Sequence, residues 1–226
     1  FNTGYTAMTS LNLGAKFDTS NVLNMSGMFC DCGNNSMTTL ELGDSFDTSK
    51  VTDMSNMFGK TGENNLKELN LKDKFNTENV TSMTGMFAST DASQMTSLNL
   101  GDKFDTSKVI DMSYMFLYTG ANHMVSLDLG DKFDTTNVIN MKSIFDNTGR
   151  EVMTTLDLGP AFTKIADEHS NMFRETGKDG AVTIYASEQI YKDKNNFKAN
   201  TDGTASIINY TRGTINPRYR TEWIKE

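Results

Sequence analysis

The chain has 226 residues, with 21 Lys and Arg against 29 Asp and Glu, a formal net charge of −8, and only two Pro and two Cys. The acidic excess lies in residues 1–180, which carry a net −10, whereas residues 181–226 carry +2. An acidic body disfavours nucleic acid as a partner. No apolar run approaches the roughly 18 residues that a membrane-spanning helix needs, so we expect no membrane insertion.

One short segment recurs through most of the chain. Phe-Asp-Thr-Ser-Asn-Val, with small variations, begins at Phe17, Phe46, Phe75, Phe104 and Phe133, always 29 residues apart, and degenerates at Phe162. A constant period between 20 and 50 residues indicates supersecondary units that bury their apolar faces only against each other. The sequence therefore predicts a repeat solenoid of the α/β class, leucine-rich-repeat-like, with about six 29-residue turns over residues 1–180.

Each repeat begins with a leucine pattern, first seen as Met8-Thr9-Ser10-Leu11-Asn12-Leu13. The alternating leucines predict a short strand, and stacked copies predict a parallel sheet. Gly14 and its equivalents predict a tight turn after the strand. The oxygens of the Asp18-Thr19-Ser20 side chains are expected to cap backbone N–H groups in the next turn.

The second half of each repeat places apolar residues three apart, as in Val22, Met25 and Met28, followed by Phe29. This spacing predicts short helical or 3₁₀ segments behind the sheet. We interpret the repeated methionines and phenylalanines as core, because Met fills irregular interiors and Ile144 replaces it freely in one copy. A copper or cofactor ligand would not be exchanged for isoleucine.

Phe17 through Cys32, with the MSxMF element and the leucine strand, resembles the BspA-like leucine-rich-repeat surface proteins. The likeness covers about six copies in residues 1–180. It implies a bacterial protein exported to the cell surface or secreted, and attachment to host or neighbouring cells. The repeat is slightly longer than the usual family unit. Thr61 and its equivalents replace the family's cysteine, which is kept at Cys32, so a polar ladder is expected there.

The terminal residues 181–226 leave the pattern. They predict a last strand at 182–186, a helix at 187–198 and a strand at 205–210, which form either a C-terminal cap or the start of a separate module. Residues 1–4 align with residues 59–62, so we expect further repeats or domains in a longer protein.

No catalytic residues, cofactor or metal site are predicted. His123 and His169 belong to no repeated constellation, Cys30 and Cys32 are too close to bridge without strain, and no hydrolase, zinc or nucleotide motif is present. Calcium could bridge stacked aspartates, but neighbouring lysines favour solvated charge instead. The aspartates concerned are Asp44, Asp73, Asp102 and Asp131 in one column and Asp18, Asp47, Asp105 and Asp134 in another.

The expected function is a non-catalytic binding or adhesion module whose partner is a protein or glycan of a host or neighbouring cell. The most irregular polar and aromatic residues, Tyr114, Tyr118, Asn122 and His123, are the candidate binding residues. Two alternatives remain: a structural stalk or spacer, favoured by near-identical repeats, and an intracellular protein–protein scaffold.

Overall fold

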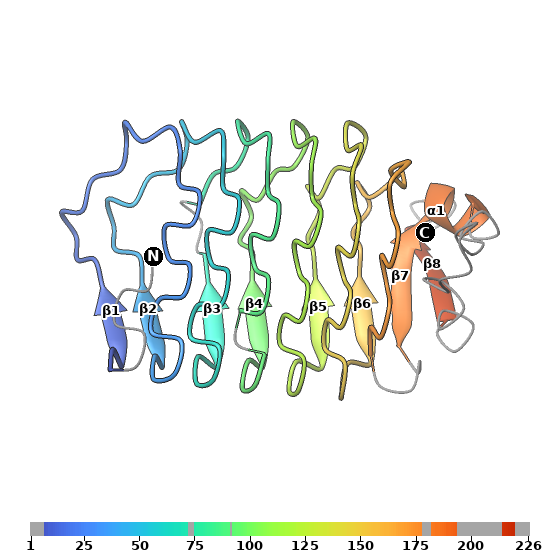
Figure 1. The fold of residues 1–226 in the computed structure, drawn as a ribbon. Helices are drawn as coiled ribbons and strands as arrows, with labels where there is room; N and C mark the ends of the chain where they lie inside the picture. Colours follow the sequence, from blue (N-terminus) through green and yellow to red (C-terminus); the bar gives the residue numbers. More distant parts are fainter. Residues whose placement is uncertain (1–6, 72–74, 91, 178–181, 194–213, 220–226) are drawn as a thin grey trace, which may run out of the picture.

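The computed structural model describes residues 7–71, 75–90, 92–177, 182–193 and 214–219, and these form a solenoid of stacked coils (Figure 1). The elements in chain order are β1 (Ser10–Asn12), β2 (Thr39–Glu41), β3 (Glu68–Asn70), β4 (Ser97–Asn99), β5 (Ser126–Asp128), β6 (Thr155–Asp157), β7 (Thr183–Ser187), α1 (Glu188–Asp193) and β8 (Thr214–Tyr219). We number each coil by the strand that opens it, so coil 1 runs from β1 to β2. The predicted repeat solenoid is confirmed.

The strands lie on one side of the solenoid, which we call the strand side, and pair in parallel. Leu11 pairs with Leu40, Leu69 with Leu98 and Leu127 with Leu156, so the 29-residue period is the spacing of the sheet register. The strands nevertheless form three separate sheets, β1–β2, β3–β4 and β5–β6–β7–β8. The strand side is therefore interrupted between coils 2 and 3 and between coils 4 and 5.

The second half of each coil, which we call the turn side, was predicted to contain short helical or 3₁₀ segments, and this was wrong. In coil 1 the N–H groups of Met28, Cys30 and Cys32 close three successive turns onto carbonyls three residues earlier, at 3.0–3.1 Å. Gly27 and Asp31 have φ values of +62° and +56°. A left-handed residue at the third position of a turn stops helix growth, so the three-residue spacing reflects turns.

The intervening N–H groups of the turn side donate to the next coil. Between coils 3 and 4, for example, Met83, Gly85 and Phe87 donate to carbonyls of coil 4 at 3.0, 2.8 and 2.8 Å, and Ser89 donates to Leu117 at 2.6 Å. Equivalent hydrogen bonds join every pair of neighbouring coils from coil 1 to coil 6. A chain of single-residue bridges from Asn24 to Glu168 runs beside them. The turn side thus forms the uninterrupted ladder of the fold.

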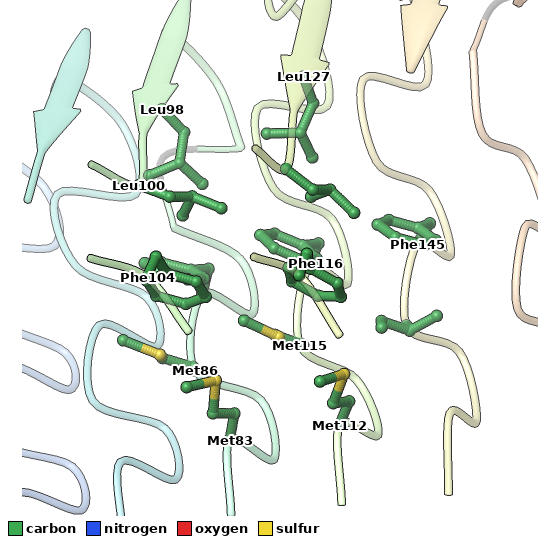
Figure 2. Packing of buried hydrophobic residues seen from close by; sticks show 14 of the residues in the cluster. Met83, Met86, Leu98, Leu100, Phe104, Met112, Met115, Phe116, Leu127 and Phe145 are labelled. Atoms are coloured by element: carbon green, nitrogen blue, oxygen red, sulfur yellow. The ribbon is translucent and has the colours of Figure 1, made fainter. Parts of the chain in front are cut away.

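The core is built from stacked columns, as predicted. Figure 2 shows leucines near the strands and phenylalanines and methionines behind them. Phe58, Phe87 and Phe116 stack at centroid distances of 5.6 and 5.4 Å. Met83 and Met86 are fully buried, and so is Ile144, which takes a methionine position in coil 5. The methionines are therefore apolar filling between coils.

Polar side chains complete the contacts between coils. Asp18 Oδ1 accepts a hydrogen bond from Ser20 N at 2.8 Å, so the predicted capping role is confirmed, although the capped element is a turn. Thr61 Oγ1 donates to the Phe29 carbonyl at 2.7 Å. The same hydrogen bond recurs in the later coils at Thr90, Thr119, Thr148 and Thr176. The expected polar ladder at the cysteine column is confirmed.

The C-terminal elements partly match their prediction. β7 is the expected strand, and α1 lies within the expected helix, with Ser187 Oγ accepting a hydrogen bond from Ile190 N at 3.4 Å. Residues 194–198 and the expected strand at 205–210 lie outside the described residues. β8 was not predicted. It pairs in parallel with β7 and extends the last sheet by one strand.

Candidate binding surface

Tyr114 and Tyr118 lie on the turn side of coil 4, at two positions that are left-handed in every coil. We call these positions the first and second left-handed columns. The first contains Gly27, Asn56, Gly85, Tyr114, Ser143 and Asn171, and the second Asp31, Lys60, Ser89, Tyr118, Asn147 and Glu175. Their φ values all lie between +53° and +62°. The backbone conformation is thus set by the coil, whatever residue is present.

Tyrosine is an unfavourable residue for these columns. Left-handed backbone costs an L-residue roughly 1–2 kcal/mol, and it is an outlier for bulky side chains, whereas Gly, Asn and Asp tolerate it. The other coils carry Gly, Asn, Ser, Asp, Lys or Glu there, so packing does not require an aromatic ring. Tyr118 is 38% exposed, and Tyr114 is half-buried. Retained strain of this kind concentrates at functional positions.

Asn122 and His123 lie in the loop that follows, and both are exposed. Asn122 N donates to the Ala92 carbonyl of coil 3 at 3.0 Å, and His123 Nδ1 lies 2.6 Å from the Ser93 carbonyl. The His123 ring is thereby held against the preceding coil. Both loop residues follow Thr119 and Gly120, which are buried and precede them on the same coil as the tyrosines.

Lys142 of coil 5 stands over the ring of Tyr114, with its Nζ 5.9 Å from the ring centroid. A cation at this distance from an aromatic face is attracted to it. The pKa of Glu168 in coil 6 is lowered, first by hydrogen bonds from Ser170 and further by the charge of Lys142. Lys142 therefore interacts with an aromatic ring of coil 4 and, through its charge, with a carboxylate of coil 6.

An ion pair between a buried aspartate and an exposed arginine lies beside Tyr118. The Asp146 carboxylate is 1% exposed and meets Arg174, with Nη2–Oδ2 and Nε–Oδ1 distances of 2.7 and 3.0 Å. Asn147 Nδ2 also donates to Asp146 Oδ1, at 2.6 Å. The pKa of Arg174 is raised, chiefly by the hydrogen bond to Asp146, with a smaller contribution from the Tyr118 phenol. Sequence reasoning missed this pair, although both residues are charged in a column that is uncharged in the earlier coils.

The loops after the strands border two hollows. One cavity of about 620 Å³ lies beside β5 and β6 and is lined by Asp102, Asp128, Asp131, Lys132 and Asp157, among others. Another of about 510 Å³ lies over coils 1–4. Among the described residues, no three His, Cys, Asp or Glu side chains come together as a metal site would require. Comparing thermal unfolding with excess chelator and with millimolar Ca²⁺ tests whether the stacked aspartates bind calcium.

Cys30, Cys32 and His169 are the remaining side chains of a type that can act as a nucleophile or a base. Cys30 and Cys32 are free thiols, and burial raises the pKa of both, aided at Cys30 by Asp31. A raised pKa disfavours the reactive thiolate. His169 is half-buried, and its Nδ1 lies 2.8 Å from the Ala166 carbonyl.

Comparison with known proteins gives one family. A model described as mycoplasma protein of unknown function, DUF285, matches residues 3–98, 34–157 and 63–185 in overlapping segments. The chain belongs to the DUF285 family. The overlap of the matches reflects the repetition of the DUF285 unit along the coils. Searches of the curated proteins and of the solved structures find no match. No helix in the described parts of this DUF285 chain is long and apolar enough to cross a membrane.

Proposed function

We propose that this chain is a non-catalytic binding array, displayed outside the cell in the manner of the BspA-like surface proteins it resembles. In this proposal the repeated columns build the scaffold, and residues that break the repeat contact a protein or glycan of a host or neighbouring cell. The observation that carries it is the pair Tyr114 and Tyr118, two aromatic side chains at left-handed positions that the other coils fill without rings.

Loop exchange tests the proposal. Replacing residues 118–123 by the coil 2 sequence of residues 60–65 amounts to three substitutions, Tyr118→Lys, Ala121→Glu and His123→Asn. We expect the melting temperature to stay close to that of the wild type, because coil 2 adopts the same backbone with this sequence. Binding to a matrix protein, glycan or cell surface retained by the wild type should fall at least about tenfold, a loss of 1.4 kcal/mol or more.

A matched control is Ile139→Thr, which replaces an exposed residue of another column by the Thr present at the equivalent position of coil 3. It should leave binding unchanged. Binding that is unchanged by the loop exchange would show that this part of coil 4 is not the contact surface. Surface display is tested separately, by antibody labelling of intact cells that produce the protein.

A structural spacer is the second candidate. It is favoured by the regularity of the stack, in which every interface from coil 1 to coil 6 repeats the same turn-side hydrogen bonds. A well-folded wild type that retains no partner above background in a broad screen would make the spacer the better description. An intracellular scaffold would instead be indicated if intact cells expose no epitope to antibody.

A further inference from the structure

The surroundings of Tyr114 and Tyr118 differ sharply on their two sides. Toward coil 5, Lys142 covers the ring of Tyr114, and the buried Asn147 follows Tyr118 in its column. Toward coil 3, the same columns hold Gly85 and Ser89, of which the first has no side chain and the second a short one. The Tyr114 ring is thus covered from coil 5, and both tyrosines are preceded in their columns by a much smaller residue of coil 3.

Polar groups that can form hydrogen bonds lie across from the rings. Asn56 of coil 2 reaches over Gly85, because a Cβ added at Gly85 would lie 2.4 Å from Asn56 Oδ1. Lys60 of coil 2 is exposed in the column of Tyr118. Asn56 and Lys60 of coil 2 and Ser89 of coil 3 therefore place polar groups on the coil 3 side of the two tyrosines.

The cations beside the rings are already engaged. Arg174 is bound to Asp146 in two contacts, and the Nζ of Lys142 lies 5.9 Å from the centroid of the Tyr114 ring. The exposed Lys60 is neighboured in its column by Asp31 of coil 1. The surface therefore offers aromatic rings together with amide, hydroxyl and ammonium groups. It is also poor in exposed aliphatic side chains, since Leu23, Ile110 and Ile139, the exposed ones of the turn side, lie in another column. The surface therefore lacks the exposed aliphatic side chains against which an apolar peptide side chain would pack.

These features fit a carbohydrate better than a peptide, because the C–H face of a sugar ring packs against an aromatic ring while its hydroxyls take polar partners. We infer that the ligand of the Tyr114 and Tyr118 surface is a neutral saccharide, stacked on the coil 3 side of the tyrosines with its hydroxyls toward Asn56, Lys60 and Ser89. The inference rests on the proposed binding function and specifies its ligand class.

The test uses Tyr114→Gly/Tyr118→Ser, which gives coil 4 the residues of coil 3 at both columns. The control is Ile110→Thr, which gives the same coil the Thr of coil 3 at a different exposed position. Probes are an array of neutral, sialylated and sulfated oligosaccharides, followed by saturation-transfer NMR with each neutral sugar retained. We expect neutral sugars to bind wild type and Ile110→Thr equally, and the double variant at least about tenfold more weakly. The melting temperature of the double variant should be unchanged or higher, because left-handed strain is relieved.

Three results would overturn the inference, and they separate it from the function it rests on. Sugar binding that persists in the double variant, or a preference for sialylated or sulfated sugars, would reject this surface or its neutral ligand. Binding of a protein partner that depends on the tyrosines, without binding of any sugar, would reject the saccharide and keep the binding function. No binding of sugar or protein by folded wild type would reject both.

Discussion

The strand side and the turn side of the solenoid come from the same repeat, yet they differ in continuity. The strand side is divided into three sheets, whereas the turn side carries the same backbone hydrogen bonds at every interface from coil 1 to coil 6. The residues of the turn side are also the more unusual, with two left-handed positions in each coil. A backbone fixed this firmly by its neighbours can hold a tyrosine in a conformation that tyrosine alone disfavours.

The largest expected effect is on the phenylalanine stack of the turn side. Phe87→Ala removes a fully buried ring that stacks on Phe58 and Phe116, and it should lower the free energy of unfolding by about 3–5 kcal/mol through the cavity left. Phe17 opens its repeat in the first coil and is 42% exposed, so Phe17→Ala should cost less than about 1 kcal/mol. Chemical denaturation of both variants checks this, and equal costs would contradict burial by neighbouring coils.

Alanine substitutions at Gly130 and Gly159 test how closely the coils approach on the strand side. Both have φ near +75°, but a Cβ at Gly159 would lie 2.1 Å from the Gly130 carbonyl oxygen, whereas a Cβ at Gly130 would meet nothing within 4 Å. Gly130→Ala should therefore cost only the left-handed strain, about 1–2 kcal/mol. Gly159→Ala should cost clearly more, because backbone must move. Similar melting temperatures for the two variants would show that the backbone of the strand side can move at little cost in stability.

The threonine ladder is expected to contribute less per residue. Thr119→Val keeps the shape of the side chain but loses the hydrogen bond to the Phe87 carbonyl, so unfolding should become easier by about 1 kcal/mol. Thr119→Ser keeps the hydroxyl and serves as the control for the lost methyl group. Thermal unfolding of both variants separates the contribution of the hydrogen bond from that of packing. A Thr119→Val variant as stable as the wild type would show that the threonine hydrogen bonds do not contribute to stability.

Sequence reasoning predicted the solenoid, its period and its core because these follow from repetition. Leu11, Met25 and Phe29 recur in fixed columns, and columns stack. It failed where local geometry has more than one solution. The three-residue spacing of Val22, Met25 and Met28 suits a helix and a series of turns equally, and only the left-handed residues decide between them.

At the candidate surface, the sequence singled out Tyr114 and Tyr118 as irregular. It could not reveal their strain, because the residue type does not determine the backbone φ angle. It also grouped Asn122 and His123 with the tyrosines by proximity in the chain, and the structure places these two exposed residues in the loop held against coil 3. The Asp146–Arg174 pair was missed because its partners lie 28 residues apart.

Amide hydrogen exchange measured by NMR tests most directly the claim that the turn side is the continuous ladder that holds the tyrosines. Amides that donate between coils there, such as those of Phe87 and Tyr114, should exchange only through opening of the whole stack. Amides of β4 and β5, which border an interruption of the sheet, should exchange faster by local opening. Strand amides protected as strongly as those of Phe87 and Tyr114, or rapid exchange at Tyr114 itself, would contradict the account.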